Sequence, residues 1–341
     1  MGKPLFKIRE NGKYGFISEE GEVVIEAQYF EAEDFYNGFS RVKFNDKLVP
    51  LDSMGRLLLK HLFNYVALFE EHLASARLVS LWGYMDERGN LVIDVQFEDA
   101  RDFSENLAAV KTSGRYGYIN KDADFVIMPQ YDTAGQFKNQ LAPVSLNQKF
   151  GYVDRQGVLV IKPQFDAANS FQGDVAVVGD KGLWGLIDKS GKMLLKPQFT
   201  MVKNVAEGEF SEGMAVVSKN DKFGFINQYG QVVVEPIYNQ AGDFGDGLAL
   251  VAIEGNFGYI NTAGDLVIRH KFEDAGIFSN GLAQVKINGK WGYIDQSGHI
   301  CIEPVYDAVL PFKYGLAWTL RQGKWAYINS NGETIWEEVL L

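Results

Sequence analysis

The sequence predicts an all-β fold of about ten tandem 34-residue repeats, each an antiparallel meander with a short helical turn. Three observations predict this fold. A short phrase, "KWGYID" at Lys290–Asp295, recurs at a fixed period along the chain. Apolar residues around it alternate with the period of a strand. Aromatic residues make up 13% of the chain, and such residues favour strands.

The phrase contains an aromatic residue whose positions set the period. Successive copies lie 34 residues apart, except for an interval of 39 between Trp184 and Phe223. Leu48 fills the position in the second copy, which is degenerate near 47–79. Ten copies fill residues 1–341, so we expect a single repeat array without a separate catalytic domain. The other aromatic positions are Tyr14, Trp82, Tyr116, Phe150, Phe257, Trp291 and Trp325.

Each copy contains three segments with the pattern of strands. The first is typified by "GLAQVKI" (Gly281–Ile287), the second is the phrase itself, and the third is typified by "VLVIK" (Val158–Lys162). Between the second and third strands, an Asp or Asn is followed three residues later by Gly, which is typical of a tight turn. The sequence therefore predicts a three-stranded meander in each repeat.

The remainder of each repeat changes its period. In "PQYDTAGQF" (Pro129–Phe137), apolar residues recur every three positions, at Tyr131, Ala134 and Phe137. This spacing predicts a tight turn of helix or a 3₁₀ segment. We expect a recurring proline to close the third strand, at Pro129, Pro163, Pro197, Pro236 and Pro304.

A glycine follows the repeat aromatic in most copies. Glycine within a strand often marks a close approach of another backbone or ring, and we expect one here. Ala326 replaces it in the last copy, where we expect a neighbour to be missing, as in a cap. The glycines are Gly15, Gly83, Gly117, Gly151, Gly185, Gly224, Gly258 and Gly292.

Two overall shapes are compatible with this pattern. We expect an open, curved superhelical array, a solenoid, because propellers normally have four to eight four-stranded blades and 34 residues is short for one. The alternative is a closed propeller-like ring. In that ring, the end segments Leu5–Glu10 and Thr334–Leu341 would complete one repeat between them.

The repeated phrases resemble the WG-repeat family of bacterial tandem repeats, also called KWG repeats. The motifs "KWGYID", "GxLVIxPxFDxA" and "FxxGLAxV" carry the resemblance, which covers essentially Met1–Leu341. The resemblance implies a binding scaffold with no established enzymatic activity, cofactor or catalytic residue. The second copy departs most, since "KLVPLD" replaces the aromatic-glycine pair and His72 stands where glycine is usual.

Charge and hydropathy exclude several partners. The net charge is −11, from 33 basic and 44 acidic side chains, which disfavours nucleic acid and anionic membranes. The most apolar stretch, Leu57–Phe69, is too short and too polar to span a bilayer. No signal peptide is apparent. We therefore expect a soluble cytoplasmic protein, unless a leader peptide has been removed.

Few residues have the spacing of a chemical site. The single cysteine, Cys301, alternates with apolar neighbours and is expected to be a small core residue. The four histidines lack the spacing of zinc ligands, so we expect no metal and no cofactor. Acids recur after the third strand at Glu98, Asp132, Asp166, Glu273 and Asp307, and we interpret them as turn or capping residues rather than a glycosidase pair.

These features favour a non-enzymatic scaffold that binds a protein or peptide partner. The alternative is a carbohydrate-binding module or glycan-acting enzyme that uses exposed aromatic residues, such as Trp82, Trp184, Trp291 and Trp325. Breaks in the repeat are better candidates for a binding site than the consensus, because insertions in repeat arrays emerge as loops on one face. The five-residue insertion near 204–209 and the degenerate copy supply the candidates Asn204, Val205, Glu207, Glu209, His61 and His72.

Overall fold

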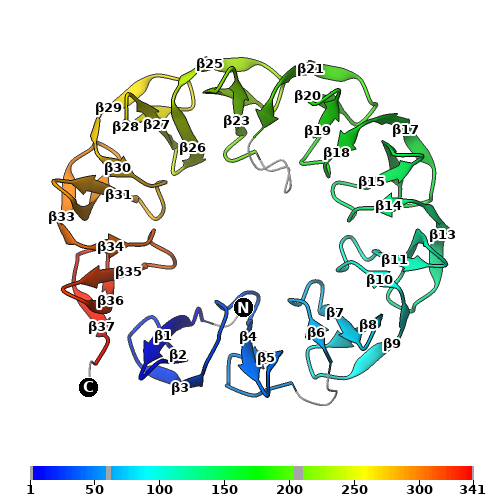
Figure 1. Ribbon diagram of the computed structural model, residues 1–341, viewed down its shortest axis with the longest axis horizontal. Coiled ribbons are helices and arrows are strands. Elements are labelled where there is room, and N and C mark those ends of the chain that lie inside the picture. The colour runs from blue at the N-terminus through cyan, green and yellow to red at the C-terminus, as the bar shows by residue number, and fades with distance from the viewer. Residues whose placement is uncertain (1–2, 59–62, 203–209, 340–341) are drawn as a thin grey trace.

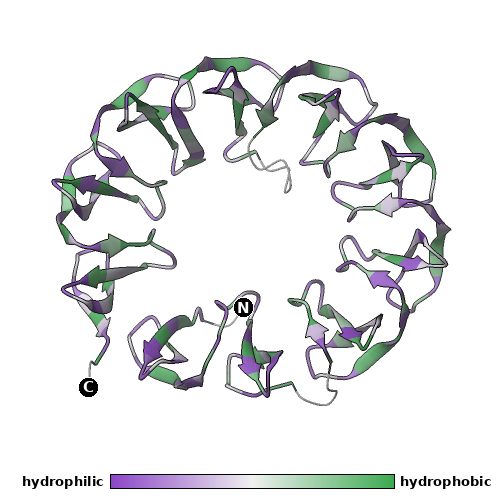
Figure 2. Cartoon of the chain, in the orientation of Figure 1, coloured by the Kyte–Doolittle hydropathy of each residue, from purple (hydrophilic) through white to green (hydrophobic). Residues whose placement is uncertain are grey.

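The computed structural model describes residues 3–58, 63–202 and 210–339, and within these ranges the chain forms antiparallel β-sheets and no helix. The same ranges form ten sheets, which we number blades 1 to 10 in chain order. The blades stand side by side around a ring (Figure 1), and hydrophobic segments recur in every blade (Figure 2). The prediction of an all-β array of about ten repeats is confirmed.

A complete blade has four strands, which we call inner, second, third and outer according to their distance from the ring centre (Figure 1). Blades 3 to 10 have all four, blade 1 has the last three, and blade 2 has the second and third among the described residues. The inner strands are β6 (Tyr65–Val66), β10 (Asp99–Ala100), β14 (Thr133–Ala134), β18 (Ala167–Ala168), β22 (Met201–Val202), β26 (Gln240–Gly245), β30 (Asp274–Ala275) and β34 (Ala308–Val309).

The longer strands follow in chain order within each blade. The second strands are β1 (Phe6–Glu10), β4 (Phe39–Phe44), β7 (Leu73–Leu78), β11 (Ala108–Thr112), β15 (Leu141–Leu146), β19 (Val175–Asp180), β23 (Met214–Lys219), β27 (Leu248–Ile253), β31 (Leu282–Ile287) and β35 (Leu316–Arg321). The third strands, which carry the repeated phrase, are β2 (Lys13–Ile17), β5 (Lys47–Asp52), β8 (Leu81–Asp86), β12 (Arg115–Ile119), β16 (Lys149–Asp154), β20 (Leu183–Asp188), β24 (Lys222–Asn227), β28 (Asn256–Asn261), β32 (Lys290–Asp295) and β36 (Lys324–Asn329). The outer strands are β3 (Val23–Tyr29), β9 (Leu91–Phe97), β13 (Phe125–Tyr131), β17 (Leu159–Phe165), β21 (Met193–Phe199), β25 (Val232–Tyr238), β29 (Leu266–Phe272), β33 (Ile300–Tyr306) and β37 (Thr334–Glu337).

The short helical turn expected after the third strand of each repeat is wrong for the described residues. This part of the repeat supplies the inner strand of the next blade instead. In blade 5, Thr133–Ala134 pairs with β15, and the flanking N–H groups of Asp132 and Gly135 donate to β15 carbonyls at 2.9 Å. Because the sheet satisfies these backbone groups, the chain does not coil on itself. The spacing of three arises because Ala134 and Phe137 are both buried between blades.

The close approach expected at the glycine of the phrase is confirmed. A Cβ atom on Gly224 would lie 2.7 Å from backbone atoms of Glu235 and Pro236, and closer still to the carbonyl oxygen of Val234. The cause is a bulge, since the three outer-strand residues Glu235–Ile237 face the single residue Gly224 across the sheet. The neighbouring backbone therefore belongs to the same blade.

The repeat prolines lie inside the outer strands, at this bulge, rather than closing them as expected. A proline lacks an N–H group, so it fits where the ladder of hydrogen bonds is interrupted. At the outer edge of the ring it also prevents pairing with another chain. The prolines placed in this way are Pro129, Pro163, Pro197, Pro236 and Pro304.

Two blades lack the glycine, and both lack the regular bulge. Val49 stands in its place in blade 2, where the described residues form no outer strand. In blade 10, Ala326 pairs directly with Glu337 of a shorter outer strand. The interpretation of Ala326 as a cap with a missing neighbour is wrong, because blade 10 packs against blade 1.

The hydrophobic core is divided among the joints, by which we mean the contacts between neighbouring blades. At the joint between blades 4 and 5, the ring centroids of Tyr118 and Phe137 lie 4.7 Å apart. The Tyr118 hydroxyl donates to the carbonyl of Gly135 at 2.8 Å. Burial raises the pKa of Tyr118, so its hydroxyl stays protonated and donates. Each blade is thus stabilised mainly by its two neighbours.

The expected open superhelical array is wrong, and the closed propeller-like ring agrees with the structure. The hydroxyl of Tyr327 in blade 10 donates to the carbonyl of Lys7 in blade 1 at 3.0 Å. The rings of Tyr327 and Phe6 meet edge to face, with centroids 5.5 Å apart. A Cβ on Gly21 of blade 1 would lie 2.6 Å from the carbonyl oxygen of Ile335. We call this joint between blades 10 and 1 the seam.

The two ends of the chain do not share a blade at the seam. Within the described residues, β1 pairs with β2 in blade 1 and β37 pairs with β36 in blade 10. The expectation that the end segments complete one repeat between them is therefore wrong. The seam is held by side chains and by the bond from Tyr327.

Candidate functional site

The sequence candidates are only partly visible. Asn204, Val205, Glu207, Glu209 and His61 lie outside the described residues.

His72 is described, and it lies on the inner turn of blade 3. Its side chain is 87% exposed, with Nδ1 at 3.0 Å from the Glu87 carboxylate. Its φ of +71° is in the left-handed region, as is that of Gly38 at the same position in blade 2, so the alignment of His72 with glycine is confirmed.

The seam lacks a part that the regular joints have. In blades 3 to 10, an inner segment, such as Asp132–Lys138 of blade 5, runs between the preceding blade and the second strand. The register places Lys7 of β1 at the position of Pro143 in blade 5, whose carbonyl accepts from that segment. No inner strand is found beside β1 in the described residues, and the carbonyl of Lys7 accepts from Tyr327 instead.

A hydrogen bond that links some of the neighbouring inner turns is also absent at the seam among the described residues. The hydroxyl of Ser279 in blade 9 donates to the carbonyl of Phe312 in blade 10 at 2.7 Å. One repeat later, Lys313 occupies the position of Ser279. Its ammonium group lies over the ring of Tyr314, 5.6 Å from the centroid, and is not bonded to a neighbouring inner segment in the described residues.

A second bond between inner turns stops at the same place. The side-chain oxygen of Asn280 accepts from the N–H of Gly315 at 3.2 Å. One repeat later, Tyr314 replaces Asn280, and Pro4, which has no N–H, takes the position of Gly315. Neither partner of the regular bond is therefore present at the seam.

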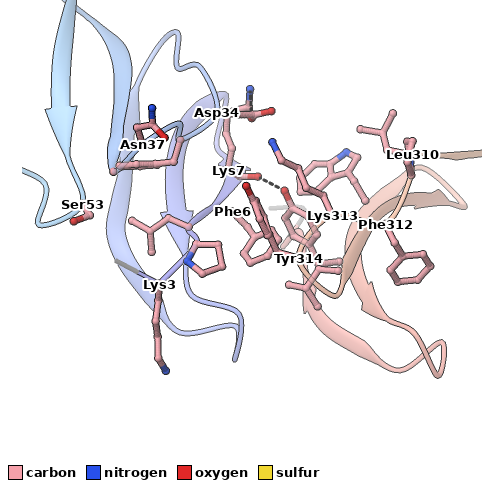
Figure 3. A pocket seen from close by; sticks show the side chains of 18 of the residues that line it. Lys3, Phe6, Lys7, Asp34, Asn37, Ser53, Leu310, Phe312, Lys313 and Tyr314 are labelled. Carbon is pink, nitrogen blue, oxygen red and sulfur yellow. Dashed lines mark hydrogen bonds and ion pairs between the residues drawn. The ribbon is translucent and has the colours of Figure 1, made fainter. Parts of the chain in front are cut away.

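A cavity of about 770 Å³ occupies this interrupted region. Phe6 of the N-terminal segment faces the inner turn of blade 10 across it (Figure 3). Its apolar wall includes Phe6, Leu316, Trp318 and Tyr327, and the exposed His72 contributes to its rim. A concave, mainly apolar site with a few polar groups is the usual form of a binding pocket.

Most charged groups of the seam cavity are paired. Lys7 lies 3.0 Å from the Asp34 carboxylate, and His72 contacts Glu87. Lys313 has no carboxylate partner in the described part of the chain, so its ammonium group is available to a ligand.

The tryptophans are half-buried, and are therefore neither fully in the core nor fully exposed as a carbohydrate-binding surface would need. Trp318 is stacked with Trp325 and with Trp336, with centroids 5.4 and 5.8 Å away. The guanidinium of Arg77 lies over Trp82, 5.5 Å from its centroid. Trp82 and Trp318 therefore each have a ring face in contact with another side chain of the same blade.

A second groove, also of about 770 Å³, crosses blades 3 to 6. Its lining includes Trp82, Arg77 and Asp102, and the Asp102 carboxylate accepts from the Ser75 hydroxyl at 2.8 Å. Burial raises the pKa of Asp102 above its usual value. This groove is more polar than the seam cavity, and its charges are shared between Arg and Asp side chains.

The recurring acids act as turn caps, as interpreted from the sequence. Asp166 is typical, since its carboxylate accepts from the N–H of Lys181 at 2.7 Å in the hairpin turn of its blade. Asp132, Asp307, Glu98 and Glu273 make the same kind of bond.

Cys301 is exposed on β33, so its expected place in the core is wrong. It occupies the face of the outer strand that points away from the joint, whereas its neighbour Ile302 is buried. In the part of the chain that the structure describes, no group of three or more His, Cys, Asp or Glu side chains is placed to hold a metal ion. No helix in that part is long and apolar enough to cross a membrane.

The chain belongs to the family described as the WG containing repeat. The family model matches residues 14–47 and then a continuous series of seven repeats, which together cover most of the chain. The internal gap between the matches, residues 48–81, coincides with the degenerate copy, and it holds most of the third strand of blade 2 and the first two strands of blade 3. The series comprises 82–116, 116–150, 150–184, 184–223, 223–257, 257–291 and 291–325.

Solved structures of similar fold include a eukaryotic initiation factor, with a TM-score of 0.52, 12% identity, and 99% of this chain and 96% of that chain covered. At this identity the likeness shows a shared, propeller-like fold alone. Two others are the dihydro-heme d1 dehydrogenase NirN in complex with DHE (TM-score 0.42, 11% identity, 78% and 73% covered) and Kluyveromyces lactis Hsv2p (0.35, 11%, 67% and 91%). The comparison with curated proteins found no match.

Proposed function

We propose that this protein is a non-enzymatic scaffold that binds a protein or peptide partner in the seam cavity, in the cytoplasm. The observation that carries the proposal is the interruption of the regular joint at the seam. There, the apolar walls formed by Phe6, Leu316 and Trp318 border a cavity of about 770 Å³ instead of a packed inner segment.

The pairing of the charged groups supports binding rather than catalysis. Lys7 is engaged with Asp34, and His72 with Glu87. A catalytic site would bring together a nucleophile, a base and an orienting group, whereas these charges form separate pairs at the rim of an apolar pocket.

A protein partner is favoured over a carbohydrate by the state of the aromatic rings. A sugar stacks on a free ring face, but Trp318 is stacked with two other indoles and Arg77 lies over a face of Trp82. An apolar cavity of this size instead suits the side chains of a peptide, which aromatic walls bind in many interfaces.

Selection of peptides from an unbiased displayed library tests the proposal. Selected peptides are expected to bind the wild-type protein and to lose affinity for Tyr314→Ser, which alters the exposed rim of the cavity. Tyr229→Ser is the matched control, because Tyr229 is similarly exposed on the far blade 7. Selected peptides that bind both variants equally would place the partner elsewhere, and a library without binders would contradict the proposed function.

A further inference from the structure

We propose that the seam binds its partner as an extended strand, which pairs with the free inner edge of β1 and inserts an aromatic side chain beside Tyr327. This inference rests on the proposed function of the seam cavity and specifies the form of the partner. The bound segment would supply to blade 1 the inner strand that blades 3 to 10 obtain from their own chain.

The backbone of β1 has the register needed for this pairing. In blade 6, the N–H of Asn169 in the inner segment donates to the carbonyl of Val177 in the second strand at 3.0 Å. The strand registers place Lys7 of β1 at the position of Val177. Two residues further along the same edge, Arg9 is exposed, and its carbonyl has no hydrogen-bond partner among the described residues. An added strand therefore finds acceptors at the regular spacing.

The hydroxyl of Tyr327 binds the β1 carbonyl that an inner strand would otherwise bind. At the joint between blades 5 and 6, the equivalent Tyr152 donates to the carbonyl of Asn169 in the inner segment, at 2.7 Å. At the seam, Tyr327 donates directly to Lys7. An N–H group of a bound segment would donate to the carbonyl of Lys7, and a carbonyl of that segment would accept from the hydroxyl of Tyr327. One hydrogen bond is thus replaced by two, and no buried group loses its partner.

The cavity accommodates the side chain that follows this pairing. In the regular joint, Phe171 of the inner segment is fully buried, with its ring centroid 4.8 Å from that of Tyr152. The seam cavity lies beside Tyr327, the counterpart of Tyr152. Lys313 occupies the position from which Ser279 donates to the carbonyl of the next phenylalanine. Its free ammonium group would therefore donate to the carbonyl of the bound aromatic residue.

The occupant is a segment of a different protein rather than of a second copy. Within the described residues, the inner segments of this chain are already held in their own joints, with phenylalanines that are buried. These are Phe69, Phe103, Phe137, Phe171, Phe210, Phe244, Phe278 and Phe312. The partner segment is expected to share their pattern, a small residue followed three positions later by an aromatic one.

Calorimetric titration of the whole protein with a short peptide tests the inference. The probe is a blocked copy of Phe165–Phe171, "FDAANSF", which joins the last residue of β17 to the inner segment of blade 6. Replacing the last phenylalanine of the peptide (Phe171→Ala) is expected to weaken binding at least tenfold, because a buried aromatic side chain is lost. N-methylation of the peptide at Asn169 is expected to weaken it similarly, because the bond to Lys7 is blocked.

Protein variants locate the peptide without altering the core. Lys313→Glu is expected to weaken binding several-fold, whereas Lys162→Glu, the same charge change at an exposed position of the outer strand of blade 5, leaves it unchanged. Equal binding of the peptide and its N-methyl analogue would overturn the strand pairing. If the probe does not bind while selected peptides still depend on Tyr314, the strand model is wrong and the proposed function stands. A dimer that the probe dissociates would assign the edge to a second copy and overturn the assignment to another protein.

Discussion

Replacement of Gly224 by valine tests the packing that defines a blade. The first added atom, Cβ, would lie 2.7 Å from the backbone of Glu235 and Pro236 and closer still to the carbonyl of Val234. Because these are backbone atoms of the adjacent strand, no side-chain rotation relieves the clash. The bulge in β25 must open by about 1 Å to restore ordinary contact. We expect a loss of about 3 kcal/mol of stability, the upper end of the range for overpacking.

Denaturant unfolding followed by Trp fluorescence measures this loss, and hydrogen exchange locates it. Exchange is expected to rise in β24, β25 and the facing strands of blade 8, because each blade is stabilised by its neighbours. Thr262→Val, which introduces the same side chain at an exposed turn, is the control and is expected to change stability by less than about 0.5 kcal/mol. An unfolding midpoint for Gly224→Val equal to that of the control would refute the role assigned to the bulge.

Three further results are expected. Tyr327→Phe and Tyr293→Phe each remove one hydrogen bond between blades, and each is expected to lower the free energy of unfolding by about 1 kcal/mol. Hydrogen exchange in β1 should rise for Tyr327→Phe alone. Equal exchange in β1 for the two variants would contradict the hydrogen bond at the seam. Burial raises the pKa of Asp102 above its ordinary 3.8, so the folded state binds the proton more tightly than the unfolded state and stability falls as pH rises above that value. Asp102→Asn should therefore be more stable than wild type at pH 7 but not at pH 3, and an equal difference at both pH values would refute the assignment. Cys301 is exposed, so one thiol should react with a disulfide reagent without unfolding. It should react more slowly than a free thiol, because partial desolvation of the sulfur raises its pKa. A thiol that reacts only in denaturant would contradict this placement.

The sequence predicts the blade well because the relevant interactions are local. The phrase, the Asp or Asn turn and the glycine all act within a few residues of one another, and the close contact at Gly224 was predictable from its place in a strand. The inner strand was not, because the pairing of Thr133–Ala134 with β15 depends on the position of the next blade. Buried residues three positions apart occur both in a helical turn and in an inner segment that lies between two blades, so this spacing does not distinguish them.

Closure of the ring could not be predicted from local sequence patterns, because it depends on the small angle between neighbouring blades summed over the whole array. The candidate site was predicted only through His72, which lies at the rim of the seam cavity. Lys313, Tyr314 and Pro4 were missed, although Tyr314 and Pro4 depart from the usual residues of an inner turn. These departures were a usable signal, because glycine and a short polar residue are usual at those positions.

A ring whose ends do not share a sheet has a consequence for how such proteins grow. In a ring closed by a mixed sheet, both ends of the gene must be kept together, and the number of units is constrained by that last sheet. Here every unit from blade 3 onward is assembled from consecutive residues, so duplication of one 34-residue stretch of coding sequence adds one whole unit. A change in the number of units then alters the joint between Lys7 and Tyr327, where the described residues share no strand. Related proteins with more or fewer repeats are therefore expected to differ most at that joint.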